Sequence, residues 1–94
     1  MNFRTLDLNL LRVFDAVMAE GSLTRAAVGL AMTQPAVSHA LRRLREACGQ
    51  DLFVRHAHGV HPTAHAEALW PQVRDALAAL RQALSPSEFD PRAD

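Results

Sequence analysis

The chain has 94 residues, of which 49% are hydrophobic and 21% charged, and these values exclude a compositionally disordered protein and favour one small folded domain. Cys48 is the only cysteine, which excludes an internal disulfide and predicts a reducing, cytoplasmic environment. Charged residues interrupt the apolar residues at the N-terminus, so we expect neither a signal peptide nor a membrane span.

The charge is distributed unevenly, although the formal net charge is zero. Residues 22–65 hold five arginines against two acidic residues, together with all five histidines, whereas the segments 1–21 and 66–94 are each net negative. A basic middle segment favours a polyanionic partner such as DNA. The zero total leaves open a helical protein-interaction module that does not bind DNA.

Apolar residues recur at helical spacing in the first half of the chain and predict three helices. The predicted ranges are about 8–20, 23–30 and 34–48. Their expected caps are Asp7, Ser22 and Thr33 at the starts and Gly21 and Gly49 at two of the ends. A short helix, a tight turn at Ala31-Met32 and a longer helix form a helix-turn-helix pattern, in which the second of the two helices enters the major groove.

The third predicted helix has two different faces. On a helical wheel, one face is apolar and consists of Val37, Leu41, Leu44 and Cys48. The opposite face is small, polar and cationic and consists of Pro35, Ser38, His39 and Arg42. We expect the first face to pack in a core, with Cys48 as a packing residue rather than a reactive thiol, and the second to meet DNA.

The second half of the chain predicts a hairpin and a long helix. An apolar strand pattern, a turn and an edge strand over about residues 52–62 predict a two-stranded wing. A helix follows over 64–84 and carries an apolar seam, which consists of Leu69, Trp70, Val73, Leu77, Leu80 and Leu84. We expect an antiparallel second copy to cover this seam, the alternative being packing within one chain. Pro71 should kink this helix or separate its first turns, and residues 85–94 should form a flexible tail or linker.

Several of these motifs, in this order, resemble the N-terminal DNA-binding domain of LysR-type bacterial transcriptional regulators. The matching segments are LDLNLL (6–11), GSLTRAA (21–27), TQPAVS (33–38), LRE (44–46), LFVR (52–55) after Gly49, and Pro62-Thr63 after Gly59. In the wing, His58 and His61 occupy positions where relatives often carry basic residues, and His39 replaces a frequent arginine on the third helix.

The resemblance implies a mainly α fold, in which residues 1–63 form a winged helix-turn-helix of three helices and a two-stranded wing and 64–84 form a linker and dimerisation helix. It also implies a homodimer on partly palindromic promoter DNA, with the third helix in the major groove and the wing at the minor groove or backbone. Family members continue into an effector-binding domain, so this chain is expected to be a DNA-binding fragment, with effector ligands bound only outside it.

The candidate DNA contacts fall into two groups. Those on the recognition helix, where amides and guanidinium groups can pair with base edges or phosphates, are Thr33, Gln34, Pro35, Ala36, Ser38, His39, Arg42 and Arg43. Those expected on the DNA backbone, at the start of the second helix, beside the outer face of the third helix and in the wing, are Ser22, Thr24, Arg25, Arg45, Arg55 and His58. The alternative is a solvated charged face, with Ser22 and Thr33 acting only as caps.

The histidines invite a metal site, but no cysteine or paired carboxylate completes one near His56, His58, His61 and His65. We therefore expect no metal, and favour added positive charge on the wing below about pH 6.5. The sequence contains no glycine-rich phosphate loop, acid–base carboxylate pair or nucleophile elbow. We therefore expect no enzymatic activity and no cofactor.

Overall fold

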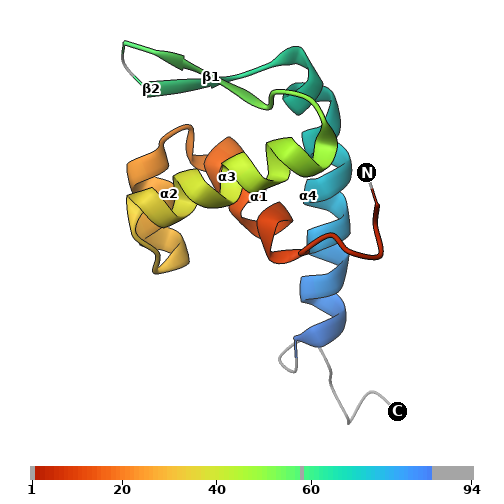
Figure 1. Ribbon diagram of the computed structural model, residues 1–94. Helices are drawn as coiled ribbons and strands as arrows, with labels where there is room; N and C mark the ends of the chain where they lie inside the picture. The colour runs from red at the N-terminus through yellow and green to blue at the C-terminus, as the bar shows by residue number, and fades with distance from the viewer. Residues whose placement is uncertain (1, 58, 86–94) are drawn as a thin grey trace, which may run out of the picture.

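The computed structural model describes residues 2–57 and 59–85. Its elements, in chain order, are α1 (Asn9–Glu20), α2 (Leu23–Leu30), α3 (Gln34–Cys48), β1 (Phe53–His56), β2 (Gly59–Pro62) and α4 (Ala64–Leu84). Helices α1 to α3 pack together, the β1–β2 hairpin extends beyond them, and α4 runs along one side (Figure 1). The mainly α, winged helix-turn-helix fold with a long C-terminal helix is thus confirmed.

The core lies where the first three helices meet. Phe14, Val37 and Leu44 are completely buried, and the Phe14 ring lies 5.9 Å from that of Phe53 at the start of the wing. On α3 the buried residues are Val37, Ala40 and Leu44, whereas Leu41 and Cys48 are only partly buried, so the core stripe is rotated slightly from the predicted one. Burial of these apolar side chains fixes which face of α3 remains in solvent.

Side-chain caps set the starts of the helices. The hydroxyls of Ser22 and Thr33 each accept a hydrogen bond of 3.2 Å from the backbone N–H three residues further on. At α1 the N-cap position is occupied by Leu8, and Asp7 acts from one residue earlier by accepting from the Asn9 N–H at 2.9 Å. The start of α3, which the candidate site depends on, is therefore fixed locally by the sequence.

Thr63 joins the wing to α4. Its hydroxyl donates to the Asp51 carbonyl at 2.8 Å and accepts from the Ala66 N–H at 3.2 Å, and its own N–H donates to the Leu52 carbonyl at 3.0 Å. Leu52 is itself almost completely buried. One residue thus closes the base of the hairpin and caps the long helix, so the wing has a fixed root on the core.

Helix α4 is continuous through Pro71, so of the two expected effects of this proline, a kink or a separation of the first turns, the separation does not occur. The missing N–H leaves only the carbonyl four residues earlier without its helical partner, and both residues are exposed, so water can solvate that carbonyl. The core contacts of Ala66 and Val73 hold the helix on both sides of the proline.

Candidate nucleic-acid interface

The solvent-facing side of α3 presents the predicted recognition residues. Gln34, Pro35, His39 and Arg42 are exposed, and Ser38 is half-buried beside them. Since Val37 and Leu44 anchor the opposite face, this side is held outward by the core. A rigid helix with a small, polar and cationic outer face suits insertion into a groove of duplex DNA.

The N-terminal ends of α2 and α3 lie together. The Thr24 hydroxyl on α2 donates to the amide Oε1 of Gln34, the first residue of α3, at 3.4 Å. Both ends carry the positive end of a helix dipole, which attracts anions. The sequence placed Thr24 and Gln34 in separate groups of candidates, and the structure brings them together.

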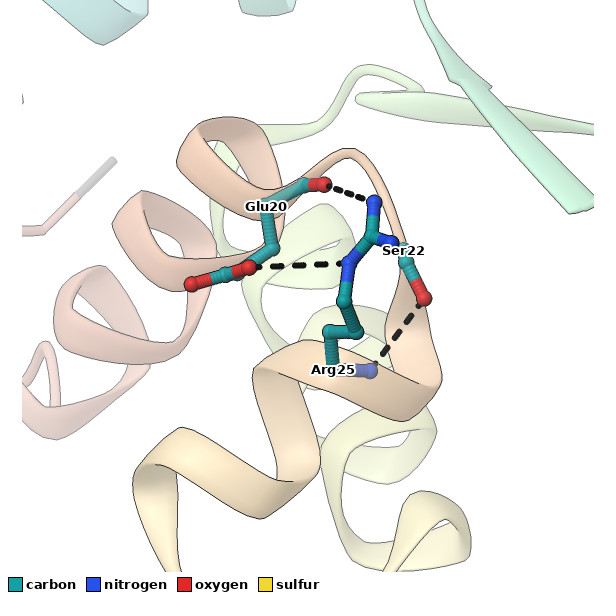
Figure 2. Close-up of polar contacts among 3 residues, drawn as sticks. All are labelled: Glu20, Ser22 and Arg25. Atoms are coloured by element: carbon teal, nitrogen blue, oxygen red, sulfur yellow. Dashed lines mark hydrogen bonds and ion pairs between the residues drawn. The ribbon is translucent and has the colours of Figure 1, made fainter.

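Arg25 has partners inside the chain. Its Nη2 donates to the Glu20 carbonyl at 3.1 Å, and its Nε lies 3.7 Å from the Glu20 carboxylate (Figure 2). Its backbone N–H donates to Ser22, as noted above. The predicted phosphate contact therefore also connects the end of α1 to the start of α2, a structural role that the sequence prediction missed.

Two arginines of α3 also have acidic partners. Arg43 Nη1 lies 3.9 Å from the Asp7 carboxylate, and Arg45 Nη1 lies 3.9 Å from the Asp51 carboxylate. Among the residues that the structure describes, Arg42 and Arg55 form no ion pair. The basic middle segment thus divides into arginines that are partly neutralised and arginines whose charge is free to meet an anion.

A groove separates α3 from the wing. Its polar and charged lining consists of Ser38, Arg42, Arg45, Asp51 and Arg55. Its apolar lining consists of Leu23, Leu41, Leu52, Phe53 and Val60. The groove brings together recognition-helix and wing candidates that are distant in the sequence.

The wing itself is a short antiparallel ladder in which Phe53 pairs with Pro62 and His56 with Gly59. Arg55 is exposed on it, and the rings of His56 and His61 lie 4.2 Å apart. The candidate His58 lies outside the described residues. Within residues 2–57 and 59–85, no group of three or more metal-ligating side chains gathers.

The Cys48 thiol at the end of α3 is partly buried and free. Burial raises its pKa, because the charged thiolate is poorly solvated there. This environment favours the neutral thiol and fits the packing role that the sequence predicted for Cys48.

The predicted dimerisation seam divides into two halves. In the first half, Val73 is buried in the core of its own chain, and Trp70 and Leu77 pack partly against that core, as the alternative of packing within one chain expects. That a second copy covers the rest of the seam stays a prediction. The sequence could not separate these cases, because one apolar stripe serves either partner. In the second half, Leu80 and Leu84 remain 53% and 79% exposed. They line an open groove with residues of α1 and the end of α2, namely Arg12, Asp15, Ala16 and Leu30.

None of the helices in the described part is long and apolar enough to cross a membrane.

Comparison with known proteins identifies relatives that are similar to this chain over almost its whole length. Residues 8–67 match the family model described as "Bacterial regulatory helix-turn-helix protein, lysR family". The chain is 51% identical over 88 residues to the HTH-type transcriptional regulator LeuO of Escherichia coli (strain K12), covering 94% of this chain and 28% of LeuO. It is 47% identical over 92 residues to the transcriptional activator NahR of Pseudomonas putida, covering 97% of this chain and 31% of NahR. The chain therefore spans less than a third of the length of these curated relatives.

Solved structures give the same relationship. A probable transcriptional regulator from Pseudomonas aeruginosa aligns with a TM-score of 0.84 at 44% identity, covering 94% of this chain and 30% of that one. The DNA-binding domain of BenM in complex with catB site 1 DNA aligns with a TM-score of 0.79 at 30% identity, covering 88% of this chain and 93% of that one. The match thus includes a domain that was crystallised on DNA.

Proposed function

This chain belongs to the LysR family of bacterial regulatory helix-turn-helix proteins and is a DNA-binding domain of a LysR-type transcriptional regulator, and we propose that it binds partly palindromic promoter DNA as a homodimer. Since members of this family regulate transcription, an enzymatic role is excluded. In the proposed complex α3 enters the major groove and the wing meets the minor groove or the DNA backbone. The protein acts in the cytoplasm, and effector ligands bind outside this segment.

The observation that supports this arrangement best is that features which attract anions lie next to the exposed face of α3. The exposed face of α3 adjoins two features that attract anions, the helix-dipole ends that meet at Thr24 and Gln34 and the arginine-lined groove of the wing. A helix in the major groove needs positive charge on both sides, because a DNA backbone flanks the groove on each side. In the proposed complex, Gln34, Pro35, Ala36 and His39 lie toward base edges.

The remaining candidates lie toward the DNA backbone. Ser22, Thr24, Thr33 and Arg25 are at helix starts, where N–H groups and the helix dipole favour phosphate oxygens. Arg43 and Arg45 are exposed on α3, and Arg55 is exposed on the wing. Backbone contacts of this kind fix the register of the protein on the duplex, whereas the base-facing residues supply its preference for sequence.

The proposed homodimer forms through the second half of α4. Leu80 and Leu84 are large, exposed apolar side chains on a helix whose first half is already anchored. The groove that they form with α1 can receive the same half of α4 from another copy, which gives the self-complementary contact of a two-fold dimer. Such a dimer would present two copies of α3, as a partly palindromic site requires.

The test begins with selection of preferred duplexes from a random pool. Affinity for a selected duplex is then measured between 50 and 200 mM salt, a range over which about six to ten phosphate contacts would cost roughly 10³- to 10⁵-fold in affinity. The control is a duplex of the same composition in scrambled order, which should bind more weakly at every salt concentration. Weak binding that does not change with salt, or equal binding to both duplexes, would contradict the proposal.

A further inference from the structure

We propose that the groove between α3 and the wing binds one phosphate of the DNA backbone, and that Asp51 regulates its occupancy by competing for Arg45. This inference rests on the proposed function, since it requires duplex DNA as the ligand. It adds a phosphate position and an acidic residue that lowers affinity. Asp51 was absent from the candidates that the sequence provided.

The lining of the groove matches the chemistry of a phosphate. Arg42 and Arg45 enter it from α3 and Arg55 from β1, so guanidinium groups converge from two elements, and the hydroxyl of Ser38 adds a donor. Guanidinium groups offer several N–H donors in a planar fork that suits phosphate oxygens. The apolar side of the groove, which includes the buried Leu52, reduces local screening and strengthens attraction to an anion.

Asp51 is the only acidic residue that lines this groove within the described chain. Its carboxylate lies 3.9 Å from Arg45 Nη1 and is therefore already paired with a guanidinium group that a bound phosphate would contact. The Asp51 backbone carbonyl accepts the Thr63 hydroxyl at 2.8 Å, which fixes the residue at the root of the wing. Asp51 is thus held beside the proposed phosphate position.

The ion pair is weak enough for DNA to displace it. The side chains of Arg45 and Asp51 are 51% and 66% exposed, and exposed pairs of this kind contribute little to stability. Arg42 and Arg55, by contrast, form no ion pair among the described residues, so their charges attract a phosphate before Arg45 is released. Each binding event must then break the Arg45–Asp51 ion pair, which lowers the affinity.

The decisive variant is Asp51→Asn, which removes the carboxylate charge and keeps both the side-chain size and the backbone bond to Thr63. Asp75→Asn is the matched control, because Asp75 is exposed on α4, pairs with Arg74 at 3.4 Å and does not line the groove. Both variants change the net charge by the same amount. We expect Asp51→Asn to bind a selected duplex about two- to fivefold more tightly than Asp75→Asn, which corresponds to the small energy of an exposed pair.

The salt dependence provides a second measurement. If Arg45 gains a full phosphate contact, the slope of log K against log salt should steepen by up to about 0.9 in Asp51→Asn. In an Arg45→Gln background, Asp51→Asn should no longer raise affinity. Equal affinities of Asp51→Asn and Asp75→Asn, or a gain that persists without Arg45, would overturn the role of Asp51. A wild-type protein that shows no salt-dependent binding would instead overturn the proposed function.

Arg42→Ala tests the phosphate itself and does not depend on the folding of the Asp51 variant. Because a phosphate is present at every sequence, the loss of affinity should be similar on selected and scrambled duplexes, and the salt slope should fall by about 0.9. A loss confined to the selected duplex would assign Arg42 to a base edge and would overturn its place in the phosphate site.

Discussion

The indole Nε1 of Trp70 on α4 donates a hydrogen bond of 2.9 Å to the Asp15 carboxylate on α1. The Arg74 guanidinium carbon lies 5.3 Å from the centroid of the same ring, so the indole also takes part in a cation–π contact. The bond lies beside the core residues of both helices. It makes the first half of α4 a structural part of the helix-turn-helix and leaves the second half available to a partner.

Asp15→Ala should lower the free energy of unfolding by about 1–2 kcal/mol relative to Asp75→Ala, because it removes the charged acceptor of the Trp70 N–H. Both changes replace an aspartate inside a helix with alanine, so their effects on helix propensity cancel. For a domain of this size the difference corresponds to roughly 4–16 °C in melting temperature.

Trp70 is the only tryptophan of the chain, so its fluorescence can follow thermal unfolding and can report on the indole environment directly. The Asp15→Ala protein should also show a changed emission spectrum in the folded state, whereas Asp75→Ala should not. Equal melting temperatures and identical spectra for the two variants would show that the bond contributes nothing.

The sequence predicted the parts of the fold that depend on local rules. Thr33 and Pro35 define the start of α3, and the apolar period defines its buried face, because capping and periodicity act within a few residues. It could not predict that Trp70 meets Asp15, because helical periodicity identifies an apolar stripe without identifying its partner. For the same reason the sequence left open whether the stripe on α4 packs against a second copy or within its own chain.

The candidate site shows the same limit. The exposed side of α3 followed from the pattern of Val37 and Leu44, but the ion-pair partners of the arginines did not. Asp7 and Asp51 lie in other segments of the chain, and only the packing of these segments brings their carboxylates near α3. A prediction from charge counts therefore recognised a basic segment and missed its internal counterions.

Leu80→Glu combined with Leu84→Glu should convert the proposed dimer to a monomer, because two glutamate charges would then have to be buried at the interface. These positions are preferable to Leu77, whose contacts with the core would confuse loss of dimerisation with loss of folding. Light scattering measures the mass, and the unchanged emission of Trp70 verifies the fold.

Val28→Glu is the matched control for this change, since Val28 on α2 is 77% exposed and does not line the groove of α4. This variant should remain a dimer. If the Leu80 and Leu84 variant also remains a dimer at the same concentrations, the interface lies elsewhere on the molecule.

Gln34→Ala should lower affinity for a selected duplex by the equivalent of about 1–3 kcal/mol if the amide reads a base edge, and should change affinity for a scrambled duplex much less. The matched control is Gln72→Ala, because Gln72 is exposed on α4, away from both helix starts. Titrations at one salt concentration suffice. Equal losses on both duplexes would identify Gln34 as a backbone contact, and no loss would remove it from the interface.

Ala31→Gly should stabilise the domain by about 0.5–1 kcal/mol. Ala31 ends α2 with φ 56° and ψ 42°, a left-handed conformation that costs an L-residue roughly 1–2 kcal/mol and glycine almost nothing, whereas the added freedom of the unfolded chain offsets about 0.4–1 kcal/mol of that gain. The melting temperature should rise by about 2–8 °C. The control, Ala68→Gly, lies inside α4 and should lower it, since glycine costs about 1 kcal/mol in a helix interior. A lower melting temperature in both variants would mean that the turn tolerates alanine without strain.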